Sequence, residues 1–226
     1  MRRLRPQWRE PFTTDAMQKL GNTRVQQLVD GVKIIVPDVL DCITSYVLYE
    51  QEDWFEDEIK FVRKIIQPGE NVIDIGANFG VYTLSIAQLV GPTATVWSFE
   101  PAPQTADFLE ASIVLNNFRN VKVLRYAVSH SSGTAQFSTS SHSELNAIIH
   151  AGSEAAASME KTETVQTISM DGAMDRFGWR DIAFLKIDGS TPTTRIHPNS
   201  RRYKARVQRR IVFVPNISKV HALVPV

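Results

Sequence analysis

The stretch NVIDIGANFG, residues 71–80, decides the fold. Its first five residues are mostly apolar and predict a short buried strand that carries Asp74, and Gly76 and Gly80 then form a turn. The apolar run Val81–Val90 that follows predicts a helix, which a Gly-Pro pair ends. A strand, a glycine turn and a helix in this order form the repeating unit of parallel α/β sheets.

The same alternation continues on both sides of this unit. Thr95–Pro101 reads as a second strand, Pro103–Asn117 as a helix and Val121–Val128 as a third strand. Upstream, apolar residues recur at helical spacing over Trp54–Ile66, and downstream Ile182–Asp188 is apolar enough for a strand buried on both faces. The sequence therefore predicts one α/β domain around a parallel sheet.

Composition limits the class of protein. The chain has 226 residues, of which 43% are apolar, enough for one globular core. No apolar run reaches the roughly 18–20 residues of a membrane-spanning helix, and the basic start has no apolar stretch behind it, so we expect neither a membrane segment nor a secretory signal. Cys42 is the only cysteine, which excludes an internal disulfide and, with no metal-binding histidine spacing, predicts no bound metal. The expected compartment is the cytosol.

Charge is distributed unevenly along the chain. Residues 1–188 carry 17 Lys/Arg and 24 Asp/Glu, whereas residues 189–226 carry 8 Lys/Arg and no acid. Such a break indicates a boundary, and it defines a basic tail at residues 189–226. Because the part before the break is mildly acidic, we expect no nucleic-acid partner. The arginines of the tail could contact RNA or a membrane, but a solvated extension is the favoured interpretation.

The glycine turn and two acids indicate the ligand class. The spacing G-x-x-x-G is neither the dinucleotide G-x-G-x-x-G nor a P-loop, which disfavours pyrophosphate. Asp74 would repel phosphates but can accept hydrogen bonds from an amino group, and Glu100, at the end of the second strand, suits two ribose hydroxyls. S-adenosylmethionine fits, with its ribose on Glu100, its aminocarboxylate at the turn and its adenine near Ala127. The alternative is that the glycine turn and the strand-end Glu occur together by chance and do not indicate a cofactor.

Four segments resemble the FkbM-type methyltransferases over about residues 32–188. They are VPDVLDCITSYVLYEQEDWFEDEIKFVRKIIQPGENVIDIGANFGVYTLSIA, SFEP, SELN and FLKID. The resemblance implies a Rossmann-like class I methyltransferase, a three-layer sandwich with strand order 3-2-1-4-5-7-6, which methylates a hydroxyl oxygen of a small molecule or sugar with S-adenosylmethionine. The residues that match the cofactor motifs of the family are Asp74, Gly76, Asn78, Gly80 and Glu100. Asp188 matches an acid beside the expected site of methyl transfer, and we expect it to act as the base. His142, directly before SELN, is a second candidate for the base. The alternative is that His142 is a histidine of a surface loop.

The likeness stops directly after Asp188, where two acids usual in the family are absent. We therefore expect a sheet incomplete in its C-terminal half, with Ile182–Asp188 at its edge, unless Ile211–Val214 pairs beside it as a substitute fifth strand. A change of reading frame or exon near Asp188 would explain the break, and a natural divergent tail is the alternative. The expected division is an extension at 1–31, an incomplete cofactor-binding domain at 32–188 and the basic tail at 189–226.

Two functions from different classes follow from this division. The first is an active O-methyltransferase. The second is a non-catalytic fragment or pseudoenzyme that keeps the cofactor half of the fold, and an oxidoreductase is a distant third. No motif in the sequence identifies the acceptor molecule, because acceptor-recognition residues belong to variable loops.

Overall fold

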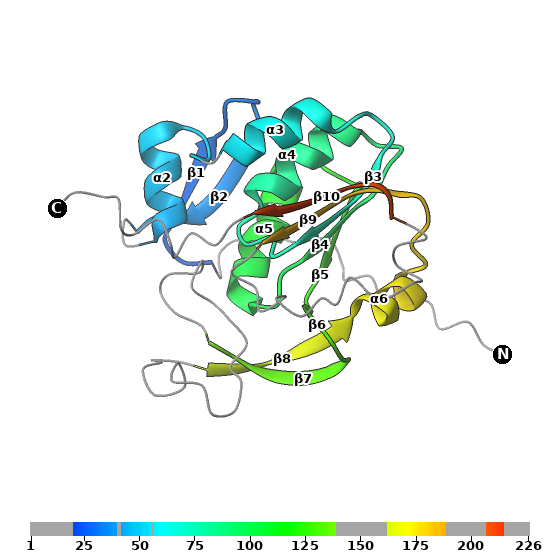
Figure 1. Cartoon of the computed structure of the whole chain (residues 1–226). Coiled ribbons are helices and arrows are strands. Elements are labelled where there is room, and N and C mark those ends of the chain that lie inside the picture. The colour runs from blue at the N-terminus through cyan, green and yellow to red at the C-terminus, as the bar shows by residue number, and fades with distance from the viewer. Residues whose placement is uncertain (1–19, 40–41, 56, 139–161, 189–206, 215–226) are drawn as a thin grey trace.

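A computed structural model describes residues 20–39, 42–55, 57–138, 162–188 and 207–214. Five parallel strands form the central sheet in the order β10-β9-β3-β4-β5 (Figure 1). Their bounds are Asn71–Ile75 for β3, Val96–Phe99 for β4, Val121–Leu124 for β5, Ile182–Asp188 for β9 and Val207–Val214 for β10. The α/β class with a parallel sheet is thereby confirmed, and β5, β4, β3, β9 and β10 occupy the places that the resemblance numbers 3, 2, 1, 4 and 5.

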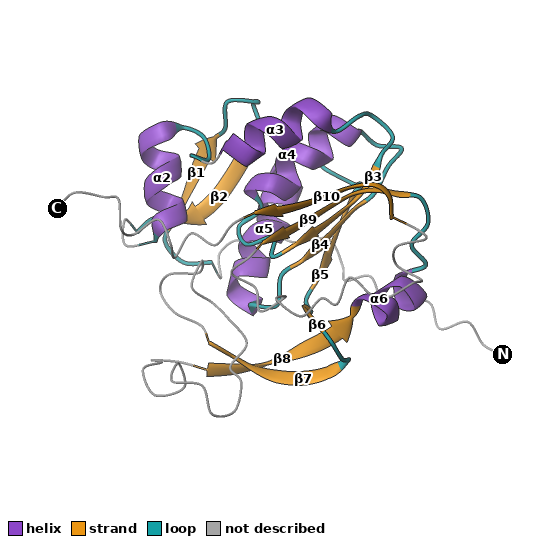
Figure 2. Ribbon diagram, viewed as in Figure 1, coloured by secondary structure: helices purple, strands orange, loops and turns teal. Residues whose placement is uncertain are grey.

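Helices cover the two faces of this sheet, which gives three layers (Figure 2). One face packs against α3 (Asp57–Ile65), α4 (Val81–Val90) and α5 (Pro103–Leu115), and the other against α6 (Met170–Phe177). Alternate residues of a strand point to opposite faces, so Val72 joins the core on the α4 side while Ile73 joins the core on the α6 side. Asp74 therefore points to the same side as Val72, toward α4.

The expected edge position of Ile182–Asp188 is wrong, and the alternative with a substitute fifth strand is what the structure contains. β10 pairs in parallel with β9, from Val207 opposite Ile182 to Val214 opposite Asp188. The physical reason is that a strand buried on both faces leaves a row of unpaired amides and carbonyls unless a neighbour covers each edge. Among the described residues, strands six and seven of the implied order have no counterpart.

The third predicted strand, Val121–Val128, divides into two. β5 ends at Leu124, where a tight turn redirects the chain. In this turn the Tyr126 N–H donates to the Leu124 carbonyl. β6 (Ala127–Ser129) then leaves the main sheet and pairs with β8 (Thr162–Ser169), which also pairs with β7 (Gly133–Ser138). The boundary between the two sheets thus lies within a segment that the sequence pattern shows as continuous.

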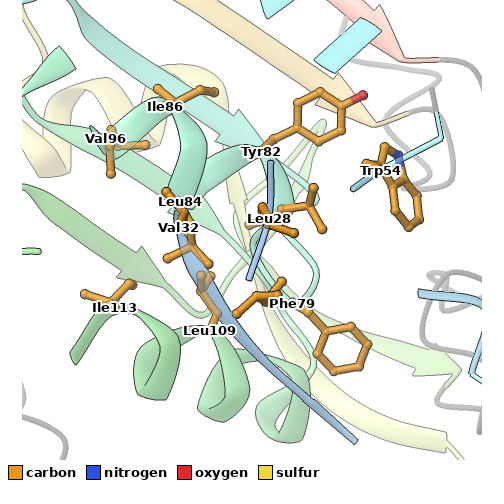
Figure 3. Packing of buried hydrophobic residues seen from close by; sticks show 14 of the residues in the cluster. Leu28, Val32, Trp54, Phe79, Tyr82, Leu84, Ile86, Val96, Leu109 and Ile113 are labelled. Carbon is orange, nitrogen blue, oxygen red and sulfur yellow. The ribbon is translucent and has the colours of Figure 1, made fainter. Parts of the chain in front are cut away.

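A hairpin that the sequence analysis did not predict packs on the α4 and α5 side. β1 (Thr23–Gln27) and β2 (Lys33–Pro37) are antiparallel and precede α2 (Ile43–Gln51). The Ile35 N–H donates to the Ser112 hydroxyl of α5 at 2.8 Å. Figure 3 shows Leu28 and Val32 of the hairpin in the cluster that contains Leu84 of α4.

The division at residues 31 and 188 remains a prediction from charge and family likeness. The structure continues the core across the first boundary, through Leu28 and Val32, and the sheet across the second, through β10. Over the described part of the chain, no helix has the length and apolar character needed to span a membrane.

Candidate functional site

The turn after β3 is bound to the neighbouring strand β4. The N–H groups of Gly76 and Ala77 both donate to the Phe99 carbonyl, at 3.0 and 2.9 Å. Gly76, Asn78 and Gly80 have positive φ angles of 76°, 50° and 102°, a region that glycine enters without cost and asparagine tolerates better than most residues. The residue types of the turn are thus those that its backbone needs.

Close packing adds a second requirement at Gly80. A Cβ at this position would lie 2.4 Å from Cδ1 of Leu109 on α5 and 3.4 Å from Cγ of Leu84. The neighbouring Phe79 is also buried and packs edge-to-face against Phe108 of α5, with ring centroids 5.4 Å apart. The turn is therefore fixed against α5 as well as against β4.

Glu100 follows the last residue of β4 and binds the turn directly. Its Oε2 accepts from the Asn78 N–H at 2.9 Å, and its Oε1 accepts from the Ala102 N–H at 2.9 Å. Hydrogen bonds from backbone amides to a carboxylate are charge-assisted, and Glu100 is buried, with 6% of the residue exposed. The two bonds fix the orientation of Glu100 at the carboxyl edge of the sheet, where parallel α/β proteins bind ligands.

Asp74 lies deeper, within β3, and is fully buried. Its Oδ2 accepts from the Thr83 hydroxyl of α4 at 2.6 Å, and its Oδ1 lies 3.2 Å from the Lys186 Nζ of β9. The expectation from the sequence is that Asp74 meets an amino group of a ligand. In the structure, the amino group that it meets belongs to Lys186.

Polar residues of three adjacent strands form a row beneath α4. Asp74 of β3 is in register with Ser98 of β4 and with Lys186 of β9, so the three side chains share one face of the sheet. The Thr83 hydroxyl donates its one proton to Asp74, so it can only accept in its 2.8 Å bond with the Ser98 hydroxyl. Ser98 is therefore the donor of that bond. All four residues are at most 1% exposed, so these polar groups depend on one another for partners.

Lys186 is the functional candidate that sequence reasoning missed. Its Nζ donates to the Gly76 carbonyl at 3.0 Å and lies 4.7 Å from the centroid of the Tyr82 ring, in addition to its ion pair with Asp74. A lysine within a strand that is apolar on both faces is the signal that could have revealed it, because a fully buried lysine requires a partner. The cation thus connects β9 to the turn after β3.

The remaining predicted site residues are Ala127, Asp188 and His142, and the structure describes the side chain of the first alone. Ala127 is fully buried in β6, where it packs with Ala102, Phe137 and Val165. Asp188 is the last residue of β9, and its backbone is in register with Val214, but its side chain is not among the described ones. His142 lies outside the described residues. The structure therefore brings together Asp74, the glycine turn and Glu100 but leaves the proposed bases as predictions.

A cation follows β5 on the same edge of the sheet. Burial alone would lower the pKa of Arg125, but hydrogen bonds and charge from Asp107 and Glu110 on α5 outweigh burial and raise it above its ordinary value. Arg125 also donates to the Pro103 carbonyl at 2.9 Å. The permanently charged guanidinium therefore holds the start of α5 against the end of β5, next to the segment that carries Glu100.

Comparisons with known proteins identify the family of the chain. The Methyltransferase FkbM domain model matches residues 74–189, just over half of the chain. Among curated proteins, 31-O-demethyl-FK506 methyltransferase FkbM of Streptomyces tacrolimicus is 33% identical over 107 residues, which cover 47% of this chain and 38% of that protein. Protein-L-isoaspartate O-methyltransferase of Aeropyrum pernix is 34% identical over 55 residues, which cover 24% of this chain and 21% of that protein.

A solved structure is also similar in part. The SAM-dependent O-methyltransferase of Thermotoga maritima aligns over 77% of this chain and 50% of its own, with 12% identity and a TM-score of 0.35. The chain thus spans well under half the length of the curated relatives that it matches. The family match contains the glycine turn, Glu100 and Lys186, and it ends one residue after Asp188. The chain belongs to the FkbM methyltransferase domain family, whose methyl donor is S-adenosylmethionine.

Proposed function

We propose that this chain transfers the methyl group of S-adenosylmethionine to a hydroxyl oxygen of a small molecule or sugar. The observation that carries the proposal is the Glu100 carboxylate, which two backbone amides fix at the tip of β4. An oriented carboxylate at this position suits a pair of ribose hydroxyls. The name of the Streptomyces relative describes methylation at an oxygen, which favours the same type of acceptor atom here.

The residues of the site suit the chemistry of this cofactor. Glu100 would accept from the ribose, and the turn from Gly76 to Gly80 would take the aminocarboxylate, because its backbone stays close to the sheet and carries no large side chain at its glycines. The adenine would lie toward Ala127. When bound, S-adenosylmethionine supplies a methyl group on a positively charged sulfur, so the protein contributes mainly alignment, which can amount to several kcal/mol.

The acceptor hydroxyl must also lose a proton. We propose Asp188 for this role, because it ends β9 beside β3, at the edge of the sheet that carries the turn. His142 is the second candidate, since an imidazole can act as a base near neutral pH. Both assignments follow from position in the sequence and the family, and substitution of each residue is the direct check.

A non-catalytic fragment or pseudoenzyme is the competing function. One observation favours it: the family match ends at residue 189, where the acid-free tail begins. Such a chain would bind the cofactor through Glu100 and the turn but would methylate no acceptor. Binding and turnover must therefore be measured separately.

Calorimetric titration of the full chain with S-adenosylhomocysteine, the product of methyl transfer, tests cofactor binding. We expect the wild type to bind and Glu100→Gln to bind at least about tenfold more weakly, because an amide cannot accept from both Asn78 and Ala102. Asn71→Ala, at the opposite end of β3, is the matched control and should retain affinity. Unchanged affinity in a folded Glu100→Gln variant would refute the site.

Turnover is tested with isotope-labelled S-adenosylmethionine and a panel of sugars and small alcohols, followed by mass spectrometry of the products. Label on an acceptor oxygen supports the enzyme, and binding without any labelled product supports the pseudoenzyme. The proposal includes a cytosolic protein without nucleic-acid or membrane partners. Cys42 is the only cysteine of the chain, which suits a reducing compartment.

A further inference from the structure

Two of the interactions of Lys186 join it to different parts of the site. It pairs with the Asp74 carboxylate at 3.2 Å, and it donates to the Gly76 carbonyl at 3.0 Å. The first interaction offsets the cost of burying two charges, with side-chain exposures of 2% and 0%. The second reaches the backbone of the glycine turn, which is the proposed contact surface for the cofactor.

The bond to Gly76 holds one side of a peptide group whose other side is held by β4. The carbonyl of the Gly76–Ala77 peptide accepts from Lys186, and its N–H, on Ala77, donates to the Phe99 carbonyl at 2.9 Å. A planar peptide anchored at both its oxygen and its nitrogen cannot rotate without breaking a bond. Because glycine restricts rotation least of all residues, Gly76 is where such an anchor has the most effect.

The next link of the turn depends on this plane. One residue after Ala77, the Asn78 N–H donates to Glu100 Oε2 at 2.9 Å. A rotation of the Gly76–Ala77 peptide would shift Asn78 and with it the donor that orients the Glu100 carboxylate. Lys186 of β9 is thus linked to Glu100, just beyond β4, through the turn that lies between them.

We propose that Lys186 is a positioning residue for S-adenosylmethionine, which presets the glycine turn by holding the Gly76 carbonyl, beyond its role as the counter-charge of Asp74. This inference rests on the proposed function, since it assigns Lys186 to the same cofactor site. It assigns no chemical step to Lys186. It requires that loss of the lysine amine weakens cofactor binding even when no unpaired charge remains.

A pair of variants separates the two roles. Asp74→Asn removes the negative charge but keeps the lysine amine, which can donate to the Gly76 carbonyl whether or not it is protonated. The double variant Asp74→Asn/Lys186→Met removes both charges and the donor together. Replacement of both members of a buried ion pair avoids the large destabilisation caused by removal of one member alone. The comparison between these two variants therefore isolates the bond to Gly76.

The measurements are the dissociation constant for S-adenosylhomocysteine by calorimetry and the melting temperature of each variant. We expect the double variant to bind at least about tenfold more weakly than Asp74→Asn, with a melting temperature that is equal or higher. Ser98→Ala is the matched control, because Ser98 belongs to the same buried row but bonds Thr83 and not the turn. It should lower the melting temperature and leave the dissociation constant unchanged.

Three results would decide against the proposal, each in a different way. Equal affinity of the double variant and Asp74→Asn would show that Lys186 serves only as a counter-charge. An equally large loss of affinity in Ser98→Ala would show that general destabilisation explains the effect. Absence of binding by the wild-type chain would instead refute the proposed function on which the inference depends.

Discussion

The tips of β3 and β4 each carry one acid beside the same turn, yet the two acids have different surroundings. Asp74 lies inside its strand, is fully buried and contacts two side chains, those of Thr83 and Lys186. Glu100 lies just beyond its strand and contacts two backbone amides. A carboxylate inside a strand faces the core and needs a counter-charge, whereas one past the strand end can face a ligand. Position relative to the strand end thus separates an acid that pairs with a buried lysine from an acid that two backbone amides hold.

The largest effect that we expect from this contrast is on stability. Asp74→Ala leaves the Lys186 ammonium buried without its carboxylate, which should cost about 3–5 kcal/mol of the free energy of unfolding. Glu100→Ala leaves two backbone amides at the edge of the sheet, where water can replace the carboxylate, and should cost about 1–2 kcal/mol. Urea unfolding of both variants measures the two losses. If Glu100→Ala were the more destabilising, Glu100 rather than Asp74 would be the acid on which the stability of the fold depends.

A smaller effect is expected at Gly80, which joins the turn to α5. Gly80→Ala forces an L-residue to φ 102° and places its Cβ 2.4 Å from Leu109 Cδ1, so we expect a loss of about 2–4 kcal/mol from strain and overpacking together. Gly178, which follows α6, is the matched control, because its backbone lies in the same left-handed region, with φ 65° and ψ 35° against 102° and 20° at Gly80. No atom lies within 4 Å of a Cβ built at Gly178.

Gly178→Ala therefore reports backbone strain alone, which should cost about 1–3 kcal/mol. The difference between the two variants in urea unfolding measures the contact with Leu109, through which α5 holds the turn. Equal losses at both glycines would mean that Leu109 moves aside at no cost. The turn would then depend on β4 and Lys186 rather than on α5.

Local patterns predicted much of the fold. The helix at Val81–Val90 and the strand at Ile182–Asp188 have the bounds that the sequence indicated. Both are apolar runs closed by strong signals, a Gly-Pro pair in one case and a charge break in the other. The glycine turn and Glu100 also lie together as the spacing predicted, because consecutive parallel strands present their carboxyl ends at one edge.

The features that the sequence did not predict depend on contacts between distant segments. The hairpin at β1 and β2 carried a local signal, Asp30-Gly31 between apolar residues, that went unused. The break between β5 and β6 had no such signal, since Leu124 and Ala127 belong to one segment with the pattern of a strand, Val121–Val128, and only their partners differ. The role of Lys186 likewise required knowledge of the register that places it opposite Asp74.

The smallest effect is expected where an acid and a lysine pair in full contact with water. Asp57 and Lys60 of α3 form an ion pair at 2.8 Å, with side chains 90% and 59% exposed. The hydrogen bond and charge of Lys60 lower the pKa of Asp57 below 3.8, so the pair stabilises the fold above that pH and loses its contribution as the pH falls through the lowered value. Solvent screening makes this contribution small.

Lys60→Met should therefore change urea unfolding at neutral pH far less than Asp74→Ala does, and the difference from wild type should disappear in acid. The two experiments compare the same pair of charged groups at opposite extremes of burial. Because the buried lysine has no water to replace its carboxylate, removal of its partner is costly, whereas Asp57 exchanges Lys60 for solvent. Similar losses in the two variants would mean that the Asp74 and Lys186 pair is itself hydrated, and then neither the buried row beneath α4 nor its hold on the turn would exist.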